Sequence, residues 1–190
     1  MNNPYDQTAF FQKYSRMGRS VEGLDGAGEW HELQKLLPDF AGKRVLDLGC
    51  GFGWHCRYAA EHGAASVLRV DISQNMLAVA RKNTSSPVVE YRRIPMEEAD
   101  FPPASFDVVL SSLAFHYLPS FSSLCGMVSR CLCPGGDFVF SVEHPIFTAL
   151  GPQDWVYDEK RAPLHWPVDR YFEEGPRQAV FLGEPVRKYH

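Results

Sequence analysis

Three glycines at alternate positions, Gly49, Gly51 and Gly53, follow a short and largely apolar run at residues 45–48. Glycine lacks a Cβ and tolerates a positive φ, so such a loop can turn sharply and let its backbone approach a ligand closely. The residues that follow, 54–61, have a helical pattern, and the first turn of a helix points unpaired N–H groups back toward the loop before it. The combination predicts a pocket for a nucleotide-type ligand.

The glycine spacing distinguishes between kinds of nucleotide. Dinucleotide-binding proteins have G-x-G-x-x-G after the strand, and here Trp54 stands where their third glycine would be. A phosphate-binding P-loop would end in Lys-Ser or Lys-Thr, and no such pair follows. The acidic residue that opens the motif, Asp47, suits a ligand with an amino group better than a pyrophosphate. The structural alternative is a glycine-rich turn that binds nothing.

The pattern D-x-G-x-G-x-G over residues 47–53 resembles motif I of class I S-adenosylmethionine-dependent methyltransferases. Further segments resemble the same family, and in the same order: D-x-S-x-x-M-L at 71–77, F-D-V-V at 106–109 and L-x-P-G-G at 132–136. The sequence is therefore identified as similar to a methyltransferase type 11-like domain, with the resemblance running from residue 45 to residue 142.

This resemblance implies S-adenosyl-L-methionine as cofactor. It places Asp71 at the end of the second strand, where a carboxylate accepts hydrogen bonds from two ribose hydroxyls; the alternative is that its charge only favours the following helix dipole. Pro95 stands where the family usually has an aspartate, and proline can offer neither a side-chain acceptor nor an N–H. The expected cofactor-binding residues are Asp47, Gly49, Cys50, Gly51, Gly53, Asp71, Ile72, Met76, Met96, Glu97, Ser112 and Tyr14.

Tyr14 belongs to a predicted leading helix over residues 8–17, and a second helix is expected over 28–37. In the family such a leading helix often acts as a lid, so Tyr14 or Arg19 can touch the cofactor. The other interpretation is that the aromatic residues of this helix only cover an apolar surface.

His116 and His144 are the candidate general bases, because histidine accepts and releases protons near neutrality. A base is needed only where the methyl acceptor must lose a proton as it attacks. Glu143 is the third catalytic candidate, placed to orient His144 or a substrate amine. The alternative for each histidine is a capping or packing role at the end of a strand.

Strand-like runs alternate with helical patterns along the chain, which predicts an α/β, doubly wound Rossmann-like sheet in three layers, α/β/α. The strands are expected at 45–48, 66–70, 88–92, 105–112 and 138–142. We expect a single methyltransferase domain over 1–190, with N-terminal helices or a lid (1–42), a cofactor-binding core (43–143) and an aromatic cover (144–190). Ligands of such sheets lie beyond the carboxyl ends of the strands.

The C-terminal part lacks residues for the helix and β-hairpin that usually complete the family's sheet, so either the chain is truncated or its element order differs. Residues 178–182 are the last segment with strand character. They are expected either to cover the edge of strand 138–142 or to leave that edge open to self-association.

The composition excludes several kinds of partner. With 22% charged residues and a formal net charge of −4, the chain has no basic surface for nucleic acid. No apolar run approaches a membrane span and no signal peptide opens the chain, so a cytoplasmic location is expected. The five cysteines match no metal-binding spacing and are expected to be reduced.

The sequence thus predicts methyl transfer from S-adenosylmethionine to an unidentified, small-molecule acceptor. The alternatives are an inactive S-adenosylmethionine-binding module, a truncated methyltransferase fragment, and an oxidoreductase that uses a dinucleotide. Trp54 argues against the last of these.

Overall fold

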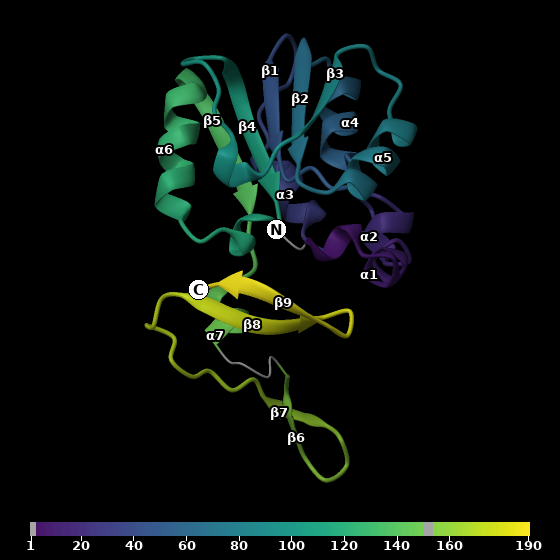
Figure 1. Ribbon diagram of the computed structural model, residues 1–190, viewed down its shortest axis with the longest axis vertical. Coiled ribbons are helices and arrows are strands. Elements are labelled where there is room, and N and C mark those ends of the chain that lie inside the picture. Colours follow the sequence, from purple (N-terminus) through teal and green to yellow (C-terminus); the bar gives the residue numbers. More distant parts are fainter. Residues whose placement is uncertain (1–2, 150–153) are drawn as a thin grey trace.

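A computed structural model describes residues 3–149 and 154–190, and its core is a parallel sheet in the order β3-β2-β1-β4-β5 (Figure 1). This confirms the predicted doubly wound α/β fold. The five strands are β1 (Arg44–Leu48), β2 (Ser66–Asp71), β3 (Val89–Arg93), β4 (Phe106–Ser112) and β5 (Leu132–Ser141).

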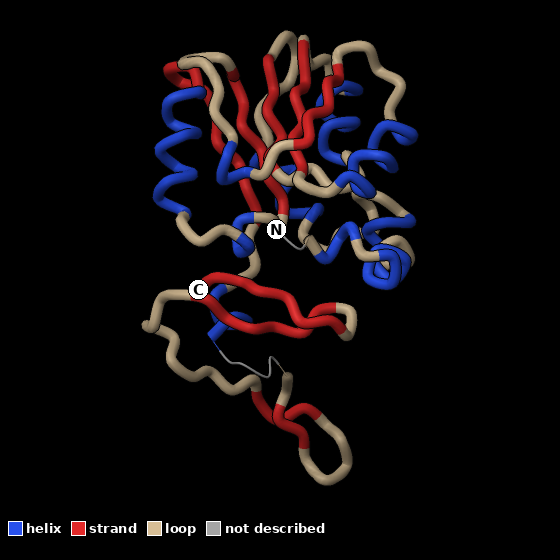
Figure 2. Tube along the Cα trace, in the orientation of Figure 1, coloured by secondary structure: helices blue, strands red, loops and turns tan. Residues whose placement is uncertain are grey.

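Helices cover both faces of this sheet, with α4 and α5 on one face and α6 on the other (Figures 1 and 2). Alternation along the strands places Val45 and Val67 in the cluster beneath α4 and α5, and Leu46 and Leu68 in the cluster beneath α6. The helical elements are η1 (Pro4–Asp6), α1 (Thr8–Tyr14), α2 (Gly18–Val21), α3 (Trp30–Leu36), α4 (Trp54–Glu61), α5 (Gln74–Asn83), η2 (Met96–Glu98), η3 (Phe115–Tyr117), α6 (Phe121–Cys131) and α7 (Pro145–Ala149).

Local signals set the helix ends. Ser73 caps α5, because its hydroxyl accepts a hydrogen bond from the Met76 N–H at 3.1 Å. Leu37 is extended before Pro38, which ends α3 at Leu36. The single helix predicted over 8–17 is wrong only at its end: α1 stops at Tyr14, and α2 begins separately at Gly18.

Strand β5 begins earlier than predicted. Leu132 pairs with Phe106, but the next recorded pair is Asp137 with Val108, so four residues on β5 bulge opposite one on β4. The Pro134-Gly135-Gly136 turn lies inside this bulge, and Gly135 takes a φ of 77° there. The predicted turn is therefore a bulge within one longer strand.

The C-terminal segment forms a hairpin of its own. In the described part of the chain, strands β8 (Pro176–Phe181) and β9 (Glu184–Tyr189) pair only with each other, and β6 (Val156–Tyr157) pairs with β7 (Pro163–His165). Figure 1 shows β8 and β9 lying beyond the carboxyl ends of the core strands. The expectation that residues 178–182 cover the edge of β5 is wrong. Within residues 3–149 and 154–190 that edge pairs with no strand, and self-association through it stays a prediction.

No helix in the described part of the chain is long and apolar enough to span a bilayer. All five cysteines are free thiols, and Cys50, Cys56 and Cys131 are buried in the core.

Candidate functional site

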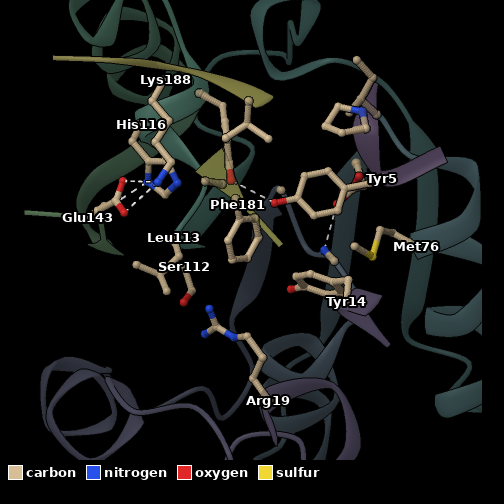
Figure 3. Close-up of a pocket in the computed structure, with 18 of the residues that line it drawn as sticks. Tyr5, Tyr14, Arg19, Met76, Ser112, Leu113, His116, Glu143, Phe181 and Lys188 are labelled. Carbon is tan, nitrogen blue, oxygen red and sulfur yellow. Dashed lines mark hydrogen bonds and ion pairs between the residues drawn. The ribbon is translucent and has the colours of Figure 1, made fainter. Parts of the chain in front are cut away.

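A cavity of about 1080 Å³ lies at the carboxyl ends of the core strands. The N-terminal helices and the β8–β9 hairpin form its other walls (Figure 3). Most of the predicted site residues line it: Tyr14, Gly49, Cys50, Gly51, Asp71, Ile72, Met76, Met96, Glu97, Ser112, His116, Glu143 and His144. Asp47 and Gly53 are not among the lining residues.

The glycine loop has different surroundings on its two sides. A Cβ built on Gly51 would meet no atom within 4 Å, so this position leaves open space. A Cβ on Gly53 would lie 1.9 Å from Arg69 Nη1, and Gly53 also has a φ of 78°. Arg69 is fully buried and donates a hydrogen bond to the Gly53 carbonyl at 3.0 Å. The guanidinium therefore fixes the end of the loop from beneath.

Asp71 joins the loop to the second strand. One carboxylate oxygen accepts from the Gly51 N–H and the other from the Ser73 N–H, both at 2.8 Å. Burial raises the pKa of Asp71 to about 6, although these backbone donors act in the opposite direction. Each oxygen keeps a further lone pair, so the carboxylate can still accept hydrogen bonds from a ligand in the cavity.

Asp47 is buried below the loop. Its carboxylate accepts a hydrogen bond from the Cys56 thiol at 2.6 Å, and it pairs in register with Arg69 on the next strand. Burial raises the pKa of Asp47 to about 6, while the Cys56 hydrogen bond and the Arg69 charge lower it. These contacts give Asp47 a role in holding the loop, and its predicted contact with a ligand amino group stays a prediction.

The N-terminal segment is attached over the cavity by hydrogen bonds to α5. Asp6 accepts from the Ser73 hydroxyl at 2.7 Å and from the Asn75 N–H at 3.1 Å. Tyr5, next to it, shares a 3.0 Å hydrogen bond with the hydroxyl of Tyr117. These contacts place the aromatic side chain of Tyr5 in the cavity wall, opposite the strand ends.

A second polar network joins the leading helices to β4 and β5. Arg19 forms an ion pair with Glu29, which accepts from the Ser112 hydroxyl at 3.0 Å. Ser112 in turn accepts from the Ser141 hydroxyl at 3.0 Å. Figure 3 shows Arg19 pointing toward Ser112 from α2. Sequence reasoning considered Arg19 but missed Glu29 and Ser141, which no local motif marks.

At the end of β5, Glu143 lies within 2.7 Å of the Lys188 ammonium group, which comes from β9. The Glu143 N–H donates to His116 Nδ1 at 3.4 Å. Burial, together with the Lys188 charge, lowers the pKa of His116 to about 3, so its imidazole is uncharged at neutral pH. His144 Nδ1 accepts from the Ile146 N–H, while the Glu143 carboxylate contacts Lys188 and no bond between Glu143 and His144 is seen among the described residues. That Glu143 orients a substrate amine stays a prediction.

Lys188 is the main residue that sequence reasoning missed. The signal for its strand was weak: Leu182-Gly183 forms a two-residue turn with both φ values positive, a position where Asn-Gly is the usual pair. Val186 and Lys188 then alternate inward on β9. The turn could have been predicted from Gly183, but the contacts of Lys188 could not.

Two solved structures are similar over most of the chain. A Listeria monocytogenes protein described as an S-adenosylmethionine-dependent methyltransferase is 59% identical with a TM-score of 0.82, over 86% of this chain and 76% of its own. An S-adenosylmethionine-dependent methyltransferase from Mesorhizobium loti is 46% identical with a TM-score of 0.82, over 88% of this chain and 76% of its own.

Sequence relatives match different shares of their own length. An uncharacterised Haemophilus influenzae protein is 34% identical over 100% of this chain and 79% of its own length. A ubiquinone biosynthesis O-methyltransferase from Idiomarina loihiensis is 35% identical over 131 residues, 62% of this chain. The chain matches about half of that enzyme, 54% of its length.

The fold and the site define a class I S-adenosylmethionine-dependent methyltransferase. Residues 46–140 match the family model for a methyltransferase domain, and the chain belongs to that family. S-adenosyl-L-methionine is the cofactor of this class, and the cavity fits it: the Asp71 carboxylate suits a ribose, the open side of Gly51 leaves room, and Ile72, Met76 and Met96 offer apolar surface for a purine.

Proposed function

We propose that this protein transfers a methyl group from S-adenosyl-L-methionine to a small-molecule acceptor. The observation that carries the proposal is the cavity itself, which joins the glycine loop and Asp71 to the Glu143 and Lys188 ion pair. A cofactor and an acceptor can therefore lie in one continuous cavity, as a direct transfer requires.

The cofactor end consists of the loop and the ends of β1 and β2. In this proposal Asp71 accepts from the ribose hydroxyls, while the open side of Gly51 leaves room for the amino-acid portion. Gly49 instead packs closely, because a Cβ there would lie 2.6 Å from the Ala114 Cβ. Met96 and Glu97 of η2 take the edge of the adenine, and Tyr14 closes this end from α1. When bound, the cofactor supplies a methyl group on a positively charged sulfur, so the acceptor must present a lone pair.

The acceptor end lies at the ends of β4 and β5. Ser112, His116, Glu143 and His144 line it, together with residues of the β8–β9 hairpin. Burial lowers the pKa of His116 and keeps its imidazole uncharged at neutral pH, which suits a hydrogen-bonding role, and Glu143 is the carboxylate at this end of the cavity. We therefore assign the role of general base to Glu143, and a neutral hydrogen-bonding role to His116.

The division of the chain follows from this arrangement. The N-terminal helices act as the lid, residues 43–143 hold the cofactor, and the C-terminal segment covers the acceptor. The ubiquinone biosynthesis relatives are O-methyltransferases, which supports an oxygen acceptor for this chain as well. The second candidate function is cofactor binding without catalysis. No contact among the described cavity residues specifically favours it.

Methyl transfer is tested with labelled S-adenosylmethionine and a fractionated metabolite extract. We expect label in a small molecule with the wild-type protein, and a loss of about a hundredfold in rate with Glu143→Gln. Calorimetry with S-adenosylhomocysteine provides the control for cofactor binding. Tight binding without any transfer would favour the inactive binding module.

A further inference from the structure

We propose that the acceptor is a phenol, whose hydroxyl binds at the Glu143–Lys188 pair and loses its proton there. The inference rests on the proposed function and deepens it, because it names the chemical class of the acceptor. Its central residue, Lys188, lies outside the part of the chain that matches the family model.

Lys188 is a buried cation in the cavity wall. Only 6% of the residue is exposed, although lysine normally keeps its ammonium group in water. Its Nζ lies 2.7 Å from the carboxylate of Glu143, which is itself only partly buried. A lysine ammonium group has three N–H donors. The ion pair with Glu143 does not use all of them, so Lys188 can also bind an anionic oxygen.

The other groups around Lys188 do not compete for its charge. His116 comes from η3 and is uncharged at neutral pH, since its pKa is about 3. Burial raises the pKa of Tyr117 to about 12, so its hydroxyl stays protonated. Of the charged side chains that β9 adds to the cavity, Glu184 lies 3.5 Å from Lys13, and Arg187 is exposed.

The opposite wall suits an aromatic ring. Figure 3 shows Glu143, His116 and Lys188 on one side of the cavity and Tyr5 on the other. The rings of Tyr5 and Tyr117 meet edge to face at 6.2 Å, and Phe181 also lines the cavity. Such edges and faces are the surfaces on which another aromatic ring packs.

The proton transfer at this site balances within the residues present. The O–H bond of the phenol breaks, its proton forms a new O–H bond on Glu143, and the electron pair stays on the phenol oxygen. Lys188 then pairs with the phenolate instead of with the neutral Glu143 carboxyl, so the total charge of the site is unchanged. A neutral amine acceptor carries no negative charge, so it gains no ion pair with Lys188.

The test uses 4-nitrophenol, whose absorption reports directly whether the bound molecule is ionised. It is titrated into the protein saturated with S-adenosylhomocysteine, and 4-nitroaniline serves as a ligand of the same shape without the acidic hydroxyl. We expect the pKa of bound 4-nitrophenol to fall by about 1 to 3, the effect of an opposite charge within hydrogen-bonding distance.

Variants separate the charge of Lys188 from its packing. Lys188→Met should restore the ordinary pKa of the bound phenol, and Lys188→Arg should keep the lowered value. Lys13→Met is the matched control: Lys13 holds the same hairpin through the Leu182 carbonyl at 2.9 Å, and this substitution should leave the phenol pKa as in the wild type. Glu143→Gln should still bind 4-nitrophenol in its ionised form. If the Glu143–Lys188 pair were only structural, this variant would lose both the binding and the ionisation of 4-nitrophenol.

The outcomes distinguish this inference from the proposed function. Failure of S-adenosylhomocysteine to bind would contradict the proposed function. Normal binding of S-adenosylhomocysteine with an unshifted pKa of 4-nitrophenol, or with a shift that survives Lys188→Met, would overturn the phenol inference alone.

Discussion

The two ends of the cavity are built in different ways. The cofactor end comes from neighbouring segments, in which the glycine loop, Asp71 and η2 follow one another along a single stretch of chain. The acceptor end brings together His116, Glu143 and Lys188 from three separate elements, and the contact between Glu143 and Lys188 spans 45 positions. The first end depends on local backbone geometry, and the second on how a distant hairpin packs.

The largest expected effect concerns the cofactor end, which depends on local backbone geometry. Gly53→Ala places a Cβ against the buried guanidinium of Arg69 and forces a positive φ on alanine. We expect it to lower the free energy of unfolding by about 2–4 kcal/mol, from the left-handed backbone and the disturbed hydrogen bond together. Chemical denaturation measures this change.

Gly28→Ala is the matched control, because a Cβ at Gly28 would meet nothing within 4 Å and its φ is not positive. We expect that variant to change stability by less than about 1 kcal/mol. Equal effects of the two substitutions would show that the loop does not depend on close contact with Arg69.

The second-largest expected effect concerns the acceptor end. Glu143→Gln removes the proposed base while keeping the shape of the side chain, so turnover should fall by about a hundredfold. The affinity for S-adenosylhomocysteine should stay near that of the wild type, since Glu143 lies away from the loop. Steady-state kinetics and calorimetry check the two quantities separately. A parallel loss of both would mean that the two ends are not independent.

A pH titration sharpens the description of the cofactor end. The pKa of Asp71 is raised to about 6, and only the ionised carboxylate accepts from two ribose hydroxyls. The affinity for S-adenosylhomocysteine should therefore be complete above about pH 7 and fall by about tenfold by pH 5. Asp71→Asn should abolish this pH dependence. A wild-type affinity that is constant between pH 5 and pH 7 would contradict the role of Asp71.

The free energy of unfolding should fall as the pH rises, whereas the affinity for S-adenosylhomocysteine rises. Asp47 and Asp71 both have folded-state pKa values of about 6, above the value of about 3.9 for an unfolded aspartate. Their favourable contribution is present below pH 4 and is lost as the pH rises through about 6. Asp71→Asn should therefore flatten part of the fall in unfolding free energy between pH 5 and pH 7, as measured by denaturation.

The smallest expected effect concerns the free edge of β5. An unpaired strand edge offers N–H and C=O groups to a second chain, so weak self-association is expected at high concentration. Light scattering over a concentration series measures it. A monomer at every concentration would show that the edge is protected by other means.

The sequence placed most of the predicted cofactor-binding residues at the cavity because their signals are local. Three glycines, the acidic end of β2 and the Ser73 cap each act through neighbouring residues, whereas Asp47 and Gly53 prove not to line the cavity. The role of Arg69 beneath Gly53 was not predicted, since it depends on the register of β1 against β2. The acceptor end was found only in part: His116 and Glu143 stand at predicted strand ends, but Lys188 reaches them through a hairpin whose docking no local pattern determines.

The central claim is that the cofactor end binds the cofactor independently of the acceptor end. It is tested most directly by calorimetry of S-adenosylhomocysteine with three proteins: wild type, Asp71→Ala and Lys188→Met. We expect Asp71→Ala to weaken binding by about 1–3 kcal/mol, because charge-assisted hydrogen bonds are lost, and Lys188→Met to bind within about twofold of the wild type. Unchanged binding by Asp71→Ala, or an equal loss in Lys188→Met, would contradict it.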